Sequence, residues 1–414
     1  MGKKTAFAAL AAPLTLPNGT VIKNRFFKSA MSEALGTRDF APKPGLFTLY
    51  RRWAEGGSGI VMTGNVMIDS RALGEPGNVV IEDERHMDAL SAWAAAGTIH
   101  DTQLWVQLNH PGKQSPKALS PEPVAPSAIP FSNRLSRFFN PPRALTETEI
   151  KEIIERFARS AGIVKAAGFS GVQIHGAHGY LVSQFLSPRH NQRSDQWGGS
   201  AENRMRFVRE IYRAIRQEVG ADFPVGIKLN STDFLRDGFA HEDSVAVIQA
   251  LADDGIDLVE ISGGTYEAPA MTGVSRRQPA VSGTEAYFLD FARQIRDTVH
   301  VPLVVTGGFR SAAAMQAALD SSGIDMVGLG RPLCLDTDAP NRILSGEAYQ
   351  SSVKPLKTGF PLIDKTALLE ITWYEKQLKR MADGGDPDPK ESALLFFFKS
   401  VFASGKQIFM KRRA

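Results

Sequence analysis

Several features that define other protein classes are scarce or absent in this chain of 414 residues. It has one cysteine, Cys334, so it can build neither an internal disulfide nor a cysteine-ligated iron–sulfur cluster. No stretch is long and apolar enough to span a bilayer. The net charge of +4 is small for this length and comes partly from the terminal KRRA. Composition therefore predicts no nucleic-acid partner and no membrane contact, and a reducing cytoplasm is the simplest compartment.

A further absence concerns nucleotide binding. The chain has no G-x-G-x-x-G after its first strand candidate, which argues against a doubly wound dinucleotide-binding sheet, the main alternative fold. Instead, short apolar runs alternate with helical patterns eight times, from RFFKSAM (25–31) to IDMVGLGR (324–331). Such alternation is typical of parallel strands. The predicted fold class is therefore α/β, a (β/α)8 TIM barrel.

Two flanking segments complete the predicted architecture. LTLPNGTVIKNR reads as an N-terminal β-hairpin with its turn at Asn18 and Gly19, so we expect a folded N-terminus rather than a secretory signal. A helical extension begins at about Asp336. We predict a barrel unit over residues 1–335 and a C-terminal extension over residues 336–414. The extension is expected to pack on the barrel or on a partner subunit, which leaves a homo-oligomer open.

The most informative stretch runs from Gly171 to Arg209. Its apolar start predicts a buried strand that ends at His175, and His178 and Tyr180 follow at short, fixed offsets. Two imidazoles that donate hydrogen bonds beside a phenol can polarise a carbonyl and deliver a proton. The spacing H-x-x-H-x-Y is short, however, and also occurs in ordinary strand-end loops.

The carboxyl ends of barrel strands are where barrel enzymes place their chemistry. After the seventh and eighth predicted strands, backbone amides and an arginine can hold an anion, which predicts a phosphate site there. Turn glycines without a ligand are the plainer interpretation. The residues of this predicted phosphate site are Gly307, Gly308, Gly330 and Arg331.

Together these residues resemble the Old Yellow Enzyme family of FMN-dependent oxidoreductases. The likeness runs from PLTLPNG to GRPL, and the block HGAHGYLVSQFLSPRHNQRSDQWGGSAENR is its most specific part. The resemblance implies FMN at the carboxyl mouth of the barrel and NADH or NADPH as the reductant. It implies as substrate a small electron-poor alkene, such as an α,β-unsaturated carbonyl compound. No metal is implied.

The resemblance also assigns roles to individual residues. It implies that His175 and His178 bind the substrate carbonyl oxygen and that Tyr180 protonates the alkene carbon. It implies flavin contacts from loops after the first three strands and from the fifth strand, with the phosphate held after the last two. The implied flavin-binding residues are Ser29, Ala30, Met31, Ser32, Gly64, Gln107, Lys228, Gly307, Gly308, Gly330 and Arg331.

Departures from the family pattern bear on this interpretation. Lys228 stands where the family usually has arginine, and lysine lacks the planar fork, so the redox potential is expected to differ. Ala34 stands where some relatives place a tyrosine that contacts substrate. Larger relatives carry a cysteine-rich iron–sulfur domain, which one cysteine excludes here.

The residues leave two other classes open. A barrel aldolase or lyase would form a Schiff base at Lys228 and hold a substrate phosphate at the glycine turns. A non-catalytic flavin-binding or membrane-tethered module is the second. Its motivation is the tail, where Leu394, Phe398, Phe402 and Phe409 recur near helical spacing among lysines. Neither the substrate nor the choice of NADH over NADPH follows from the sequence.

Overall fold

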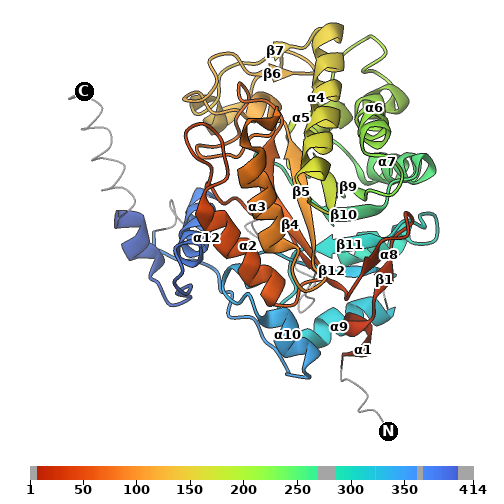
Figure 1. Ribbon diagram of the computed structural model, residues 1–414. Coiled ribbons are helices and arrows are strands. Elements are labelled where there is room, and N and C mark those ends of the chain that lie inside the picture. The colour runs from red at the N-terminus through yellow and green to blue at the C-terminus, as the bar shows by residue number, and fades with distance from the viewer. Residues whose placement is uncertain (1–6, 269–285, 287, 322, 361–366, 400–414) are drawn as a thin grey trace.

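Eight parallel strands form a closed barrel in the computed structural model, which describes residues 7–268, 286, 288–321, 323–360 and 367–399 (Figure 1). Each strand pairs with its neighbour in the chain, and the last pairs with the first. The predicted TIM barrel is confirmed. Its strands are β3 (Phe26–Lys28), β4 (Ile60–Met67), β5 (Gln103–Asn109), β8 (Gly171–Gly176), β9 (Val225–Asn230), β10 (Leu258–Ser262), β11 (Leu303–Thr306) and β12 (Met326–Leu329).

Helices connect the strands and surround the barrel (Figure 1). A capping box formed by Thr146 and Glu149 fixes where helix α4 begins. The main connecting helices are α2 (Pro44–Glu55), α3 (Met87–Gly97), α4 (Glu147–Ala166), α6 (Ala201–Val219), α7 (His241–Asp254), α8 (Leu289–Ile295) and α9 (Ala312–Ser321). Shorter elements are α1 (Ala8–Ala11), α5 (Leu181–Leu186), α10 (Ala339–Leu344) and the two-stranded pair β6 (Val124–Ala125) and β7 (Arg143–Ala144).

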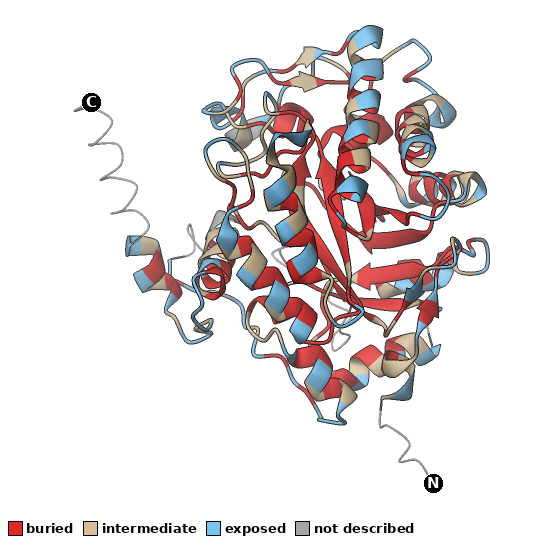
Figure 2. Ribbon diagram, in the orientation of Figure 1, coloured by how far each residue is buried: buried red, intermediate tan, exposed pale blue. Residues whose placement is uncertain are grey.

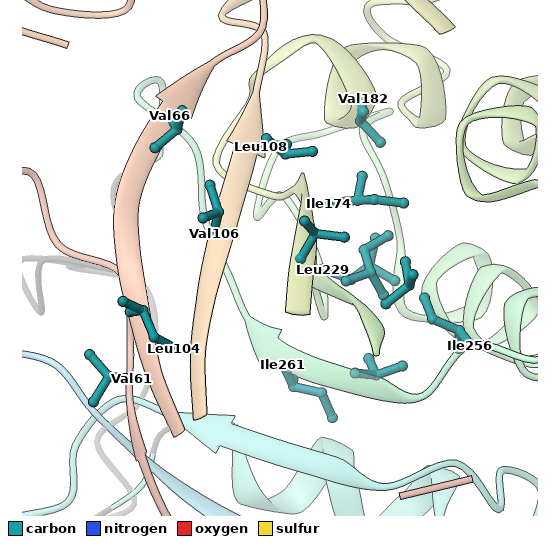
Figure 3. Close-up of a cluster of buried hydrophobic side chains, with 14 of the residues drawn as sticks. Val61, Val66, Leu104, Val106, Leu108, Ile174, Val182, Leu229, Ile256 and Ile261 are labelled. Carbon is teal, nitrogen blue, oxygen red and sulfur yellow. The ribbon is translucent and has the colours of Figure 1, made fainter. Parts of the chain in front are cut away.

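The main hydrophobic core lies between the barrel wall and these helices (Figures 2 and 3). Alternate strand residues face it, because successive side chains of a strand point to opposite faces. On β5 the outward residues are Leu104, Val106 and Leu108, and on β8 Ile174 faces the same way. Burying one such aliphatic side chain contributes about 1.5–3 kcal/mol. On β5 and β8 the alternate residues, which include Gln107, Asn109 and Gln173, face the barrel interior.

An N-terminal hairpin closes the amino end of the barrel. Strands β1 (Leu14–Thr15) and β2 (Val21–Ile22) pair antiparallel, and Gly19 takes the positive φ of 87° that the turn needs. This confirms the predicted hairpin. Leu14, Leu16 and Ile22 pack against inward apolar residues such as Trp105. The lower half of the barrel is thus apolar and filled, so polar chemistry is confined to the carboxyl end.

The C-terminal extension contributes helix α12 (Ala367–Ala382), which lies beside α2 (Figure 1). Trp373, Leu378 and Met381 of α12 are buried in the same hydrophobic cluster as the barrel helices. Residues 393–399 are also helical, but Phe402 and Phe409 of the predicted apolar face lie outside the described residues. Among the helices of the described segments, none is long and apolar enough to cross a membrane.

Candidate active site

A chain of hydrogen bonds crosses the barrel interior above the apolar floor. Gln107 Nε2 donates to Gln173 Oε1 at 2.7 Å, and Gln173 Nε2 donates to Glu260 Oε2 at 2.9 Å. Lys228 Nζ lies 3.1 Å from the other oxygen of Glu260, which also accepts from Thr306 Oγ1 at 2.7 Å. The glutamate is fully buried, and its partners satisfy both oxygens. Two predicted flavin-binding residues, Gln107 and Lys228, therefore belong to one network.

Sequence reasoning missed the centre of this network. Glu260 sits in the apolar run DLVEIS, and an acid at an inward position of a buried strand was the available signal. Ser29, predicted to line the flavin, joins the network through a 2.8 Å contact between its hydroxyl and that of Thr306. Gly328 is required beside them, because a Cβ there would lie 1.8 Å from Thr306 Oγ1.

The structure brings His175, His178 and Tyr180 together at the end of β8. The two imidazole centroids are 5.1 Å apart, and the His175 and Tyr180 rings are 4.8 Å apart. His178 adopts a positive φ of 61°, which turns the loop so that all three rings meet. His178 Nε2 lies 2.9 Å from Ser262 Oγ on β10, a partner that the sequence alone did not identify.

Both imidazoles are held neutral. Burial lowers the pKa of His175 and of His178 well below the usual value, and the positive charge of Lys228 lowers both further. His175 Nδ1 accepts a hydrogen bond from the Ala177 amide at 3.3 Å, so its proton resides on Nε2. When Ser262 donates to His178 Nε2, the His178 proton resides on Nδ1. Each ring then has one N–H group to offer a ligand oxygen.

Tyr180 is buried beside a second phenol. Its Oη lies 2.9 Å from Tyr266 Oη, and the two rings meet edge to face. Burial raises the pKa of Tyr180 well above 10, and Tyr266 and Glu75 raise it further. Tyr180 therefore remains a protonated phenol at neutral pH. Sequence patterns did not single out Tyr266, and residues 269–285 lie outside the described part of the chain.

The opposite side of the mouth carries two carboxyl groups that the sequence did not connect. Ser32 Oγ lies 2.5 Å from Glu75 Oε2 and 2.6 Å from Glu375 Oε1 of α12. A hydroxyl has one proton, so one of these carboxyls must itself donate. Burial, reinforced by the charge of Glu375, raises the pKa of Glu75 to about 7. Ala30 and Met31 lie beside Ser32 in the partly exposed loop after β3.

Gly64 and the glycines that follow the last two barrel strands present backbone groups where a side chain would not fit. The Gly64 amide donates to Tyr50 Oη at 3.0 Å, and a Cβ at Gly64 would lie 2.7 Å from the Met31 carbonyl oxygen. Gly307 and Gly308 follow β11 with φ of 120° and 95°, which side-chain-bearing residues rarely adopt. Gly330 follows the neighbouring β12, and a Cβ there would lie 3.0 Å from the Met31 sulfur.

The predicted phosphate-binding arginine has an acidic neighbour. Arg331 Nη1 lies 2.9 Å from Glu370 Oε2 of α12, so the extension reaches this side of the mouth as well. Burial raises the pKa of Glu370, and the charge of Arg331 opposes that rise. An incoming phosphate dianion would compete with this carboxylate for the arginine. The C-terminal extension therefore bears on anion binding here.

The residues present fit a flavin. Asn109 follows Gln107 by two positions on β5, so both face the barrel interior, and both Asn109 amide atoms are buried without a partner among the described residues. The amides of Gly307 and Gly308 likewise donate to no acceptor in the described part of the chain. A polar ring and a phosphate group would offer partners to these groups. The described residues contain no group of three or more metal-ligating side chains.

Comparison with known proteins also indicates a flavin-dependent enzyme. The sequence profile described as the NADH:flavin oxidoreductase / NADH oxidase family matches residues 9–350. The NADH-dependent flavin oxidoreductase iccE of Talaromyces variabilis is 36% identical over 408 residues, which cover 91% of this chain and 99% of that protein. Fold and comparison together define a flavin-dependent oxidoreductase on a TIM barrel.

Comparison with solved structures shows which flavin-dependent oxidoreductases this chain resembles in fold. An old yellow enzyme homologue from Zymomonas mobilis superposes with a TM-score of 0.71 at 25% identity, covering 83% of this chain and 95% of that one. Morphinone reductase in complex with tetrahydroNAD superposes with a TM-score of 0.68 at 26% identity, covering 83% and 93%. The chain belongs to the NADH:flavin oxidoreductase / NADH oxidase family, and its predicted resemblance to Old Yellow Enzymes is confirmed.

The surroundings of Lys228 argue against the aldolase or lyase alternative, and the relatives argue against the non-catalytic alternative. The lyase alternative needs a free amine at Lys228, but Lys228 Nζ is buried and lies 3.1 Å from the Glu260 carboxylate. The non-catalytic alternative is disfavoured because relatives that match most of the chain are named as NADH-dependent oxidoreductases.

Proposed function

We propose that the chain is an FMN-dependent reductase of activated alkenes that uses NADH or NADPH as its reductant. Ser29, Gln107 and Lys228 would hold the flavin ring, and the backbone at Gly307, Gly308, Gly330 and Arg331 would hold its phosphate. Bound FMN would supply hydride uptake from the reduced nicotinamide and hydride donation to the alkene. The proposal rests on family membership and on the fit of the polar groups at the barrel mouth.

His175 and His178 bind the substrate carbonyl oxygen in this proposal. Negative charge grows on that oxygen as the alkene carbon accepts hydride, and two N–H donors stabilise it. The low pKa of both rings matters because a neutral imidazole does not lose its proton to the oxygen in the ground state. Ser262 holds His178 in the tautomer and orientation that this role requires.

Tyr180 supplies the proton. As the new C–H bond forms at the second alkene carbon, the Tyr180 O–H bond breaks and its electron pair remains on the phenolate oxygen. Water restores that proton after product formation. The observation that carries the proposal is the cluster of two neutral imidazoles and one protonated phenol. The ring centroids of His175 and His178 are 5.1 Å apart, and those of His175 and Tyr180 are 4.8 Å apart.

Replacing Tyr180 with Phe tests this reaction class, because it removes the O–H group and keeps the ring. Protonation by a positioned acid contributes about 10²–10⁴-fold, so single-turnover reduction of cyclohexenone should slow by that order. Flavin reduction by nicotinamide and the reduction of a quinone, which is protonated on exchangeable oxygens, should remain close to parental. The cofactor released by heat should have the mass of FMN.

Equal losses with the enone and the quinone would mean that Tyr180 shapes the pocket without donating the proton. A released cofactor with the mass of FAD, or no flavin at all, would overturn the cofactor assignment.

A further inference from the structure

A second phenol stands behind the proposed proton donor. Tyr266 Oη lies 2.9 Å from Tyr180 Oη, with the ring centroids 6.0 Å apart and an interplanar angle of 68°. Tyr180 is 7% exposed, whereas Tyr266 is only partly buried. Tyr266 is therefore the more exposed residue of the two.

The loop that carries Tyr266 is fixed to the loop that carries Tyr180. Thr265 forms a parallel bridge with His178, and Asn230 Nδ2 donates to the Gly264 carbonyl at 3.0 Å. Thr265 and Ala268 exchange backbone hydrogen bonds of 3.0 and 3.1 Å, which close a tight turn around Tyr266. These contacts hold the two loops together, and they bring the two phenols into contact.

An ionic anchor holds the next residue, Glu267. His190 Nε2 lies 3.3 Å from Glu267 Oε2, and Lys113 Nζ lies 3.1 Å from His190 Nδ1. Arg189 approaches the same carboxylate at 3.9 Å. Its positive neighbours and the hydrogen bond to His190 hold the pKa of Glu267 below its usual value although burial opposes this. Lys113 and the pair Arg189 and His190, from two separate segments, thus fix Glu267 beside Tyr266.

The direction of the phenol–phenol hydrogen bond decides whether Tyr180 can act. If Tyr180 donates to Tyr266, its proton points away from the substrate. If Tyr266 donates to Tyr180, the Tyr180 proton is free to reach the substrate. The Tyr180 phenolate that remains after proton transfer then already accepts a hydrogen bond from Tyr266. Burial raises the pKa of Tyr266 to about 12. Burial also raises the pKa of Tyr180 well above 10, and Tyr266 and Glu75 raise it further. Either phenol can donate across this contact, and donation by Tyr266 is the direction that leaves the Tyr180 proton for the substrate.

We propose that Tyr266 is a positioning residue for Tyr180. Tyr266 donates a hydrogen bond to Tyr180 Oη and passes its proton to that oxygen in the same step in which Tyr180 protonates the substrate. In the step, the Tyr180 O–H bond breaks as the substrate C–H bond forms. The Tyr266 proton moves to Tyr180 Oη, and the negative charge passes to Tyr266 Oη, where water neutralises it. No oxidant or reductant beyond the proposed reaction is involved. The inference rests on the proposed alkene reduction.

Tyr266→Phe in the flavin-loaded enzyme tests the inference. One hydrogen bond to a developing charge is worth roughly a 10- to 100-fold rate change, so single-turnover cyclohexenone reduction should slow by that order. Enone binding, flavin reduction by nicotinamide and quinone reduction should stay within about twofold. The proton inventory in H2O–D2O mixtures should be curved in the parent, because two phenolic protons move, and linear in Tyr266→Phe. A purely structural role would not change that curvature.

Two further variants separate the possible failures. Adding Tyr266→Phe to Tyr180→Phe should cost nothing more, because the two phenols act in series. Tyr212→Phe, which removes a phenol on α6 far from the mouth, should leave the enone rate unchanged. If Tyr180→Phe is slow but Tyr266→Phe keeps the parental rate and a curved inventory, this inference is wrong and the proposed function stands. If Tyr180→Phe itself keeps the parental enone rate, the proposed function fails and the relay fails with it.

Discussion

The two sides of the barrel mouth reduce their buried charge by opposite routes. On the side of β8 and β10, His175 and His178 are buried beside Lys228, and each ring keeps one N–H proton and carries no charge. On the side of β3 and α12, Glu75 and Glu375 are buried around one hydroxyl, and the pair retains a proton near neutral pH. Burial disfavours charge in both cases, and the ionisable type decides whether a proton leaves or stays.

This difference teaches what kind of ligand the mouth accepts. The imidazoles offer N–H donors without a formal charge, which suits a neutral carbonyl oxygen better than a carboxylate. While it shares a proton, the carboxyl pair carries one negative charge instead of two. A buried charge pair, Lys228 and Glu260, lies deeper in the barrel and sets the local field. The proposed acceptor, a neutral electron-poor alkene, matches both sides.

The largest expected effect comes from removing the buried cation that pairs with Glu260. Lys228→Met would leave the Glu260 carboxylate buried without its cation, which typically costs about 3–5 kcal/mol of unfolding free energy. Denaturant unfolding of the flavin-loaded protein measures this loss. Lys228→Arg keeps the charge and should lose much less. Lys228→Met combined with Glu260→Gln should recover most of the loss, and a single Lys228→Met variant of parental stability would contradict the ion pair.

Removing one donor on the histidine side is the next test. His178→Ala should lower enone reduction by about 10²–10³-fold, which is the usual cost of losing one oxyanion donor. Flavin reduction should suffer less. His300→Ala, at an exposed position, serves as the matched control. If His178→Ala reduces enones at the parental rate in single-turnover measurements, the carbonyl oxygen is held elsewhere.

The smallest expected effect concerns the carboxyl pair and the pH dependence of Tm. The folded pKa of Glu75, about 7, exceeds its unfolded value near 4.5. Its contribution to stability is therefore full below about 4.5 and is lost as pH rises through 7. Glu375→Gln removes the neighbouring charge, so the fall in Tm between pH 5 and 8 should become shallower by on the order of 1–2 °C.

The buried histidines act in the opposite direction. Their stabilising contribution is present above pH 6.5 and is lost as pH falls, but it is common to the parent and to Glu375→Gln. Asp383→Asn, which removes an exposed charge at the end of the same helix, should not change the slope. An unchanged slope in Glu375→Gln would mean that the two carboxyls do not share a proton.

Sequence patterns predicted the architecture well because local rules govern it. The eightfold alternation, the Asn18–Gly19 turn and the capping box at Thr146 each depend on neighbours a few residues apart. The family block likewise placed His175, His178 and Tyr180 within one short segment. Some departures were equally visible, such as Lys228 in place of the arginine usual in the family.

What the sequence could not show are the contacts between distant segments. Ser32 and Glu375 are 343 positions apart, and they meet only because α12 docks against α2. Tyr180 and Tyr266 are 86 positions apart and meet because the loops after β8 and β10 bridge at His178 and Thr265.

The sequence by itself determined the barrel, its hairpin and the cluster of imidazoles and phenol at the end of β8. Tertiary structure alone decided which protons those groups hold, because pKa values follow from burial and from charges brought in by other strands. It also placed Glu260 in the barrel interior, and Glu375 and Tyr266 at the mouth. No periodicity or motif encodes such contacts, since they arise where parallel strand ends and a docked helix converge.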